Sequence, residues 1–245
     1  MPAIDLPFAT QEGESSVQQN SQESLINMFA EVELSARQRL IRIQRMGLRA
    51  LYTIAGAKRC MEVAGSGYHY CIIGAGFYRF NGTTLTIRGT MASSDSRCTL
   101  VTDDLGNVLI SDGLNAYYWD GATLTQMAFP TAVGPVAFMA GYGIYPVPNS
   151  SRFYVTGLNA LNTVDPLDFA TAESNPDPIV RIFTDHNELW IFGTRSTEIW
   201  SLSGAADFPF VPYTNAQMER GCRAAFSVAS EDNTLFWLGN DDVVY

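Results

Sequence analysis

Residues 188–200, ELWIFGTRSTEIW, contain two apolar runs that are separated by a glycine and a short polar segment. The first run ends at Gly193 and the second at Trp200. Each run has the length and the aromatic and β-branched content of a β-strand, and the small and polar residues between them are typical of a turn. The stretch therefore predicts a strand, a turn and a second strand.

Similar segments recur along the chain, and we align them on the glycine that follows the first apolar run. The spacings between successive glycines are 39, 44, 36 and 46 residues, and a second run often follows, as in FYRF at 77–80 and AYYW at 116–119. A period of about 40 to 50 residues with several short strands is typical of β-propeller blades. The aligned runs are HYCIIG ending at Gly74, NVLISDG at Gly113, RFYVTG at Gly157, ELWIFG at Gly193 and TLFWLG at Gly239.

The first two copies share their exit, FNGTTL and WDGATL, in which Asn81-Gly82 and Asp120-Gly121 suit the positive φ angles of a tight hairpin turn. Between the repeats no stretch keeps a 3.6-residue apolar period. We therefore predict a mainly β fold of propeller-like repeats, with four units reasonably complete and the fifth truncated after DVVY at 242–245. Such an incomplete propeller either continues in a longer protein or borrows strands from a partner.

The N-terminal part differs in composition from the repeats. Residues 9–24 are poor in apolar residues, so we expect an extended arm over 1–34, followed by a propeller-like domain over 35–245. We expect residues 1–24 of this arm to be disordered in isolation and to become ordered on assembly. Residues 35–49 fit a strand or a short helix, with either a solvated basic face or a contact with an acidic partner. Five arginines lie in this stretch: Arg37, Arg39, Arg42, Arg45 and Arg49.

Composition limits the function classes. The 245 residues are 47% hydrophobic, 12% aromatic and only 16% charged, which indicates much buried surface. The 15 Lys and Arg against 25 Asp and Glu give a net charge of −10, which disfavours direct nucleic-acid binding because that affinity comes largely from cations. The sequence shows neither a secretory signal nor an apolar run long enough to span a membrane, so we expect synthesis in the cytoplasm without membrane insertion.

Metal and cofactor motifs are weak. Scattered cysteines without CxxC spacing, and only His69 and His186 to join them, predict thiols in the interior and no zinc site. The segment CIIGAGFYR resembles the opening of a dinucleotide fold, but Arg79 occupies the third glycine position and a hairpin turn follows it, so no cofactor is expected. The cysteines are Cys60, Cys71, Cys98 and Cys222.

Catalytic signals are equally weak. Ser111-Asp112-Gly113 is the nearest approach to the aspartate turn of sialidase-type blades, but its aspartate directly follows the serine. The pairs Asp103-Asp104 and Asp241-Asp242 fit turns, and neither histidine lies beside a nucleophile in the sequence. Glu198 fits a ring interface or an outward-facing strand position equally well. We therefore predict no enzyme and assign no catalytic, cofactor, metal or interface residue.

The stretch from Ala172 to Asp242 resembles the packaged-DNA stabilization proteins of short-tailed phages, which are also called tail accessory or tail hub proteins. The central run from Glu188 to Trp200 is the most specific part, and weaker similarity extends back to NMFAE at 27–31. An expected early Arg-Gly-Met element reads Arg59-Cys60-Met61 here. The motifs that carry the resemblance are AESNPDPIVRI at 172–182, NELWIFGTRSTEIWSLSG at 187–204, FPF at 208–210, ERGC at 219–222 and FWLGND at 236–241.

The resemblance implies a structural protein of the virion tail that joins the head-tail connector to the distal tail and seals the vertex to retain packaged DNA. Its implied partners are copies of itself in a ring, the portal or portal-adaptor protein, and the tailspike and tail needle proteins. The alternative is a carbohydrate-binding or glycan-cleaving propeller of a receptor-binding tail component.

Overall fold

The computed structural model describes residues 28–32, 40–44, 50–93, 95–172, 177–205 and 207–245. Internal contacts divide the chain into two units, Met1–Thr53 and Ile54–Tyr245. The boundary that we predicted after residue 34 lies within the first unit. Of the arm expected over residues 1–34, only residues 28–32 lie in the described part of the chain.

A two-stranded hairpin forms the described part of the first unit. Strand β1 (Met28–Val32) pairs antiparallel with β2 (Leu40–Gln44), with Phe29 opposite Ile43. Residues 40–44 are therefore a strand, as one of the two alternatives for the arginine-rich stretch predicted. Of its five arginines, only Arg42 lies in the described residues.

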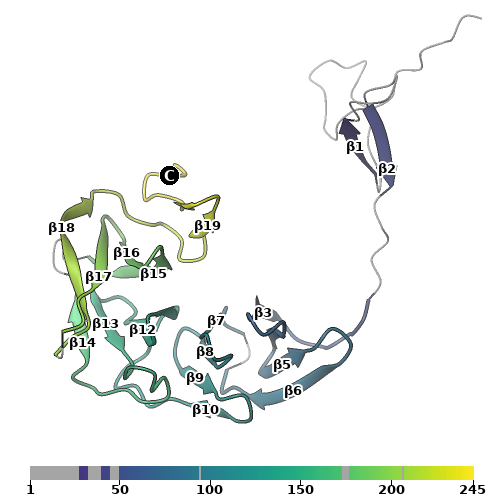
Figure 1. Cartoon of the computed structure of the whole chain (residues 1–245), viewed down its shortest axis with the longest axis horizontal. Coiled ribbons are helices and arrows are strands. Elements are labelled where there is room, and N and C mark those ends of the chain that lie inside the picture. The colour runs from purple at the N-terminus through teal and green to yellow at the C-terminus, as the bar shows by residue number, and fades with distance from the viewer. Residues whose placement is uncertain (1–27, 33–39, 45–49, 94, 173–176, 206) are drawn as a thin grey trace, which may run out of the picture. The chain divides into compact units, whose positions relative to one another are not determined.

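The second unit contains four four-stranded antiparallel sheets and then a two-stranded sheet, as Figure 1 shows. Within each sheet every strand pairs with the next one in the sequence, so the predicted mainly β, propeller-like fold is confirmed. The described residues contain no helix, and hence none that could cross a membrane. The sheets are β3 (Lys58–Val63), β4 (His69–Ile73), β5 (Gly76–Phe80) and β6 (Leu85–Thr90); β7 (Thr99–Thr102), β8 (Val108–Ser111), β9 (Ala116–Trp119) and β10 (Leu124–Gln126); β11 (Ala137–Met139), β12 (Tyr142–Pro146), β13 (Arg152–Val155) and β14 (Phe169–Thr171); β15 (Ile179–Asp185), β16 (Glu188–Gly193), β17 (Thr197–Leu202) and β18 (Phe210–Met218); and β19 (Ala229–Glu231) with β20 (Thr234–Phe236).

Neighbouring sheets meet face to face, with their first strands β3, β7, β11 and β15 in contact one after the other. Hydrophobic clusters fill the spaces between successive sheets. An aromatic pair crosses each of these spaces and adds about 0.5 to 1.5 kcal/mol beyond the burial of its area. The pairs, with the distances between their ring centroids, are Phe77–Trp119 at 5.6 Å, Phe129–Tyr145 at 4.7 Å, Phe153–Trp200 at 5.3 Å and Phe192–Trp237 at 5.2 Å.

The turns show how local sequence forms the hairpins. Asn81-Gly82 and Asp120-Gly121 do lie in turns, but only the glycines have positive φ, 94° and 92°, so the predicted pair of positive φ angles is wrong. The side chains cap four-residue loops instead, since Thr84 N donates to Asn81 Oδ1 at 2.7 Å and Thr123 N to Asp120 Oδ1 at 2.6 Å. Two-residue hairpins with positive φ at both positions occur at Ala140-Gly141, His186-Asn187 and Asp232-Asn233.

The third repeat is aligned one strand too late in the sequence analysis. Its RFYV run is β13, the third strand of its sheet, whereas the runs ending at Gly74, Gly113 and Gly193 belong to the second strands β4, β8 and β16. The true second strand is β12, which ends at Pro146 and is not followed by a glycine. An alignment on glycines therefore passed over it.

The fifth repeat contains more pairing than its two strands. Beyond β20 the chain turns back, and Trp237 N donates to Tyr245 O at 3.1 Å while Tyr245 N donates to Trp237 O at 3.0 Å. The DVVY segment thus lies antiparallel to the end of the TLFWLG run, in the order that the repeat predicted.

Candidate functional site: a pocket at the starts of the first strands

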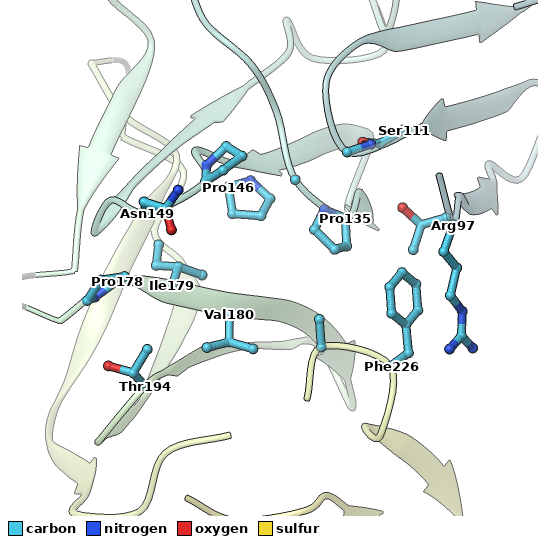
Figure 2. A pocket seen from close by; sticks show the side chains of 15 residues that line it. Arg97, Ser111, Pro135, Pro146, Asn149, Pro178, Ile179, Val180, Thr194 and Phe226 are labelled. Atoms are coloured by element: carbon cyan, nitrogen blue, oxygen red, sulfur yellow. The ribbon is translucent and has the colours of Figure 1, made fainter. Parts of the chain in front are cut away.

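A pocket of about 380 Å³ opens where the starts of β7, β11 and β15 meet the segment before β19 (Figure 2). Its volume is within the usual range for ligand pockets, about 300 to 1,000 Å³. Four prolines form much of its wall, together with Ile179, Val180 and Phe226. None of its described lining residues is acidic. The prolines are Pro135, Pro146, Pro148 and Pro178.

The local sequence explains this wall. Proline lacks an N–H donor, so it is placed where a strand begins or ends. Pro178 directly precedes β15, and Pro146 ends β12 while its carbonyl accepts a hydrogen bond from Gly134 N at 2.6 Å. Thr99 fixes the neighbouring strand, because its Oγ1 accepts a hydrogen bond from Val136 N at 3.0 Å. The walls are therefore held by a backbone hydrogen bond beside the third sheet and by a side-chain hydrogen bond from the second sheet to the segment before the third.

Two arginines converge on the ring of Phe226 beside this pocket. The Cζ of Arg97 lies 3.9 Å from the ring centroid, and Figure 2 shows the two side chains side by side. The Cζ of Arg181, on β15, lies 5.7 Å from the same centroid. Both distances suit a cation–π contact.

Arg181 forms no ion pair with an acidic side chain in the described part of the chain. Burial, and then the charge of Arg97, lower the pKa of Arg181 to about 10, so the side chain stays protonated at neutral pH. Its Nε and Nη1 are buried without a hydrogen-bond partner in the described part of the chain. Neither arginine forms an ion pair with any described residue.

A second polar group joins the first two sheets. Arg59, on β3, is only 3% exposed and donates from Nη1 to Gly74 O at 3.1 Å and Ser93 O at 2.6 Å, and from Nη2 to the hydroxyls of Ser93 and Ser96, both at 2.8 Å. Its Nε also donates to Ser96 O. Ser93 Oγ donates in turn to Asp112 Oδ2 at 2.8 Å, and Ser96 Oγ to Asp112 O at 2.6 Å. The guanidinium is therefore saturated with acceptors.

The carboxylate of Asp112 is itself well satisfied. Its Oδ1 accepts hydrogen bonds from Leu114 N at 3.0 Å and Asn115 N at 2.6 Å. Burial acts to raise the pKa of Asp112, but the donors from Asn115, Ser93 and Leu114 hold it below its usual value. Ser111-Asp112-Gly113 thus forms a structural turn, and its carboxylate is engaged in capping.

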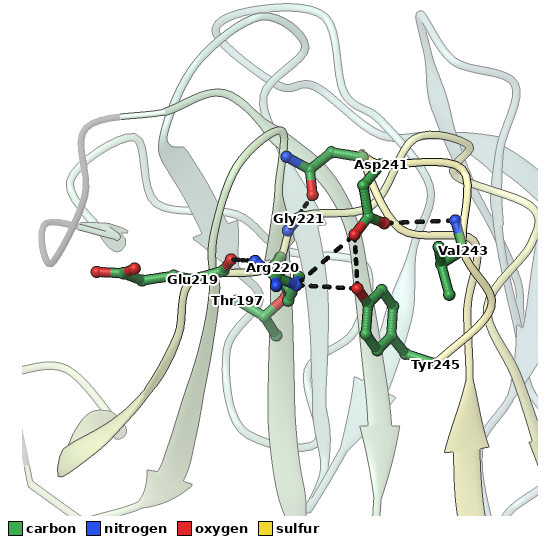
Figure 3. A network of polar contacts seen from close by, with 8 residues as sticks. Thr197, Glu219, Arg220, Gly221, Asp241, Val243 and Tyr245 are labelled. Atoms are coloured by element: carbon green, nitrogen blue, oxygen red, sulfur yellow. Dashed lines mark hydrogen bonds and ion pairs between the residues drawn. The ribbon is translucent and has the colours of Figure 1, made fainter.

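A third network, shown in Figure 3, joins the fourth sheet to the fifth. Arg220 Nε donates to the Tyr245 hydroxyl at 2.9 Å, and that hydroxyl donates to Asp241 Oδ2 at 2.6 Å. Thr197 Oγ1 donates to Arg220 O at 2.7 Å, which ties the group to β17. The side chains of Arg220 and Asp241 are 54% and 41% exposed, so this network meets solvent.

The other residues considered in the sequence lie in structural positions. CIIGAGFYR forms the β4–β5 hairpin, with Arg79 opposite Tyr70. A hairpin turn and no helix follows this segment, as the sequence predicted. Asp103 caps the β7–β8 turn by accepting from Asn107 N at 2.7 Å. Among the described residues, no group of three His, Cys, Asp or Glu side chains is placed to hold a metal.

The four thiols are free. Cys98 and Cys222 are buried, as expected, but Cys60 and Cys71 are half-buried. A hydrogen bond with Cys98, and then burial, raise the pKa of Cys60, and burial raises that of Cys71. Cys60 and Cys71 are therefore poor nucleophiles.

Glu198 is buried in this chain, so the outward-facing position, one of the two alternatives considered for it, is wrong. It is 4% exposed, and its Oε2 accepts a hydrogen bond from Trp200 Nε1 at 3.0 Å. Glu198 and Trp200 are two residues apart on β17, so strand alternation places both side chains on the same face, which is the buried one.

The sequence analysis did not identify the groups around Arg59 and Phe226 as sites. Arg59 was noted only as part of an altered Arg-Gly-Met element, although an arginine in a strand beside apolar residues does signal a buried charge. The arginines on Phe226 come from distant segments, and no local spacing links them.

Comparison with known proteins gives one family and several similar folds. Residues 5–243 match the family model described as bacteriophage P22 Gp10, β-propeller. No curated protein matches.

Solved structures are similar in fold, at low sequence identity. The computationally designed Ika8 protein has a TM-score of 0.52 at 12% identity, over 90% of this chain and 67% of its own. YCF48 from Cyanidioschyzon merolae has a TM-score of 0.51 at 15% identity, over 84% and 70%. The extracellular domain of the putative one-component system BT4673 from B. thetaiotaomicron has a TM-score of 0.55 at 8% identity. The aligned region covers 97% of this chain but only 34% of that chain.

Proposed function

Because the chain belongs to the bacteriophage P22 Gp10 family and is a phage structural protein, we propose that it is a non-enzymatic part of the virion tail. In this proposal it joins the head-tail connector to the distal tail and seals the vertex after DNA packaging. The observation that carries the proposal is the family match over residues 5–243 together with the succession of four-stranded sheets.

The physical character of the second unit supports a mechanical role. Aromatic pairs cross each space between sheets, and buried or bridging polar groups lock the first junction and the last. A scaffold of this kind resists deformation because each sheet is packed on its neighbours to the density of a protein core. The net charge of −10 suits a plug that does not grip the phosphate backbone.

The proposed partners are further copies of the chain in a ring, the portal or portal-adaptor protein, and the tailspike and tail needle proteins. The described residues that line the pocket include no carboxylate pair, which glycan cleavage by the usual mechanism requires. The glycan-cleaving alternative therefore has no supporting observation in the described pocket.

The decisive experiment removes the chain from the assembling particle. Phage that carry a nonsense codon in its gene should fill their heads with DNA and then lose it, measured as DNA that becomes sensitive to nuclease after packaging. Adding the folded chain to these particles should restore DNA retention, whereas adding chain that has been denatured should not. Filled particles that retain their DNA without the chain would contradict the proposal.

A further inference from the structure

The two arginines on Phe226 form a cationic site whose counter-charge is absent from the described residues. We propose that Arg97 and Arg181 bind a carboxylate that an acidic peptide segment of a partner protein presents to the adjoining pocket. This inference concerns a ligand of the second unit and does not depend on the role of the chain in the virion.

Electrostatics supplies the first step. Two guanidinium groups close to one aromatic ring repel each other, and each needs acceptors when it is withdrawn from water. Arg181 is largely buried, and its Nε and Nη1 lack hydrogen-bond partners in the described chain. An incoming oxyanion would supply the missing counter-charge to both arginines and would accept hydrogen bonds from Arg97, and hydrogen bonds between ions are the stronger kind.

Placement supplies the second step. Arg97 is exposed and lines the pocket, so it can reach a ligand that occupies the cavity. Arg181 does not line the pocket, and it contributes its positive charge from its position near the same ring. The ring of Phe226 is 38% exposed, which leaves part of it available to a ligand. The site therefore combines a charged anchor with an apolar surface.

The apolar character of the pocket walls favours a peptide carboxylate over a phosphate group as the bound anion. Pro135, Pro178 and Val180 offer apolar surface that suits the aliphatic flanks of a peptide and gives a hydrated phosphate nothing to bond to. A nucleic-acid backbone would also meet a chain with a net charge of −10, whereas a single carboxylate meets mainly the local arginines. The pocket chemistry therefore favours an acidic peptide with apolar neighbours.

The test uses the full chain and four probes, each added separately. Two are capped tripeptides, the acidic Leu-Glu-Leu and its neutral counterpart Leu-Gln-Leu, and two carry phosphate, namely inorganic phosphate and a short DNA duplex. Binding is followed by the NMR signals of the arginine Nε–H groups. The acidic tripeptide should shift the signals of Arg97 and Arg181 in a saturable way, and the neutral one should bind at least about tenfold more weakly because the charged hydrogen bonds are lost.

Variants locate the effect. Arg97→Gln should weaken the acidic tripeptide by about tenfold or more, and because Arg97 is exposed the variant should fold. Arg152→Gln is the matched control, since Arg152 is also exposed and stacks on a ring, with its Cζ 4.2 Å from the centroid of Phe169, but does not line this pocket. Equal binding of both tripeptides, tighter binding of phosphate or DNA, equal losses in both variants, or no saturable shift would each overturn the proposal.

Discussion

Two junctions between sheets of the second unit each contain an arginine, a hydroxyl and an aspartate, but these groups are buried in one junction and exposed in the other. Between the first and second sheets, Arg59, the hydroxyls of Ser93 and Ser96, and Asp112 lie largely away from water. Between the fourth and fifth sheets, an arginine, a hydroxyl and an aspartate, those of Arg220, Tyr245 and Asp241, lie at the surface.

This difference in burial determines how much stability each junction loses when one of its polar side chains is removed. A buried charge must have every donor or acceptor satisfied, so deleting its partner leaves groups that water cannot reach. An exposed ion pair is replaced by hydration at little cost. The first junction should therefore be rigid and sensitive to substitution, whereas the last relies on packing around Trp237 more than on its polar contacts.

The largest expected effect tests this contrast directly. Arg59→Met should lower the free energy of unfolding by about 3 kcal/mol or more, because it leaves buried acceptors on Ser93, Ser96 and Gly74 without a donor. Denaturant unfolding followed by tryptophan fluorescence measures the change. Arg220→Met is the matched control and should leave stability close to that of the unsubstituted chain. Similar losses in the two variants would remove the distinction between the junctions.

A smaller loss of stability should follow from adding a side-chain atom at Gly221, near the junction of the fourth and fifth sheets. A Cβ at Gly221 would overlap the backbone of Thr194 and Arg195, so Gly221→Ala should cost about 1 to 3 kcal/mol by forcing the turns apart. Gly65→Ala is the control, since nothing lies within 4 Å of the added atom. Comparing the two melting temperatures measures the effect, and a Gly221→Ala variant as stable as the control would show that the junction yields easily.

The smallest expected effect depends on pH. His186 bridges the last two sheets, with Nδ1 2.6 Å from Asp185 Oδ2 and Nε2 2.6 Å from Asn233 Oδ1. The hydrogen bond to Asp185, and then that to Asn233, raise the pKa of His186 above its usual 6.5. The stabilisation is therefore complete below the unfolded-state pKa and is lost as pH rises through the higher folded-state pKa.

The measurement compares the melting temperature of the unsubstituted chain with that of His186→Gln across this range. The difference should be largest near about pH 6 and shrink as pH rises. His69→Gln, which removes the histidine beside Phe80, controls for general effects of losing a histidine. A difference that is constant with pH would show that the contact does not depend on the imidazolium.

The repeat architecture could be predicted from sequence because strand-forming runs and turn residues are local signals. The four hairpins aligned on Gly74, Gly113, Gly193 and Gly239 occur where those signals placed them. The third repeat was misaligned because β12 ends at Pro146 and is not followed by a glycine. Turn-forming residues between apolar runs predict the positions of strands well, but they do not say which strand of a sheet a given run will form.

The polar groups were harder to predict because they depend on contacts between distant segments. Asp112 and Arg59 are joined through Ser93 and Ser96. Alternation alone does not say which face of β17 is buried, so it left the position of Glu198 open. The pairing of Arg97 with Arg181 on Phe226 spans three sheets. Neither residue spacing nor composition carries that information.

The pairing of every strand with its successor has a consequence for the growing polypeptide. Each of the four complete sheets needs only a continuous stretch of chain, such as 58–90 or 99–126, to form all of its hydrogen bonds. Contacts close in sequence form quickly and without waiting for distant segments. Each sheet can therefore form as its last strand leaves the ribosome and serve as a template against which the next sheet packs.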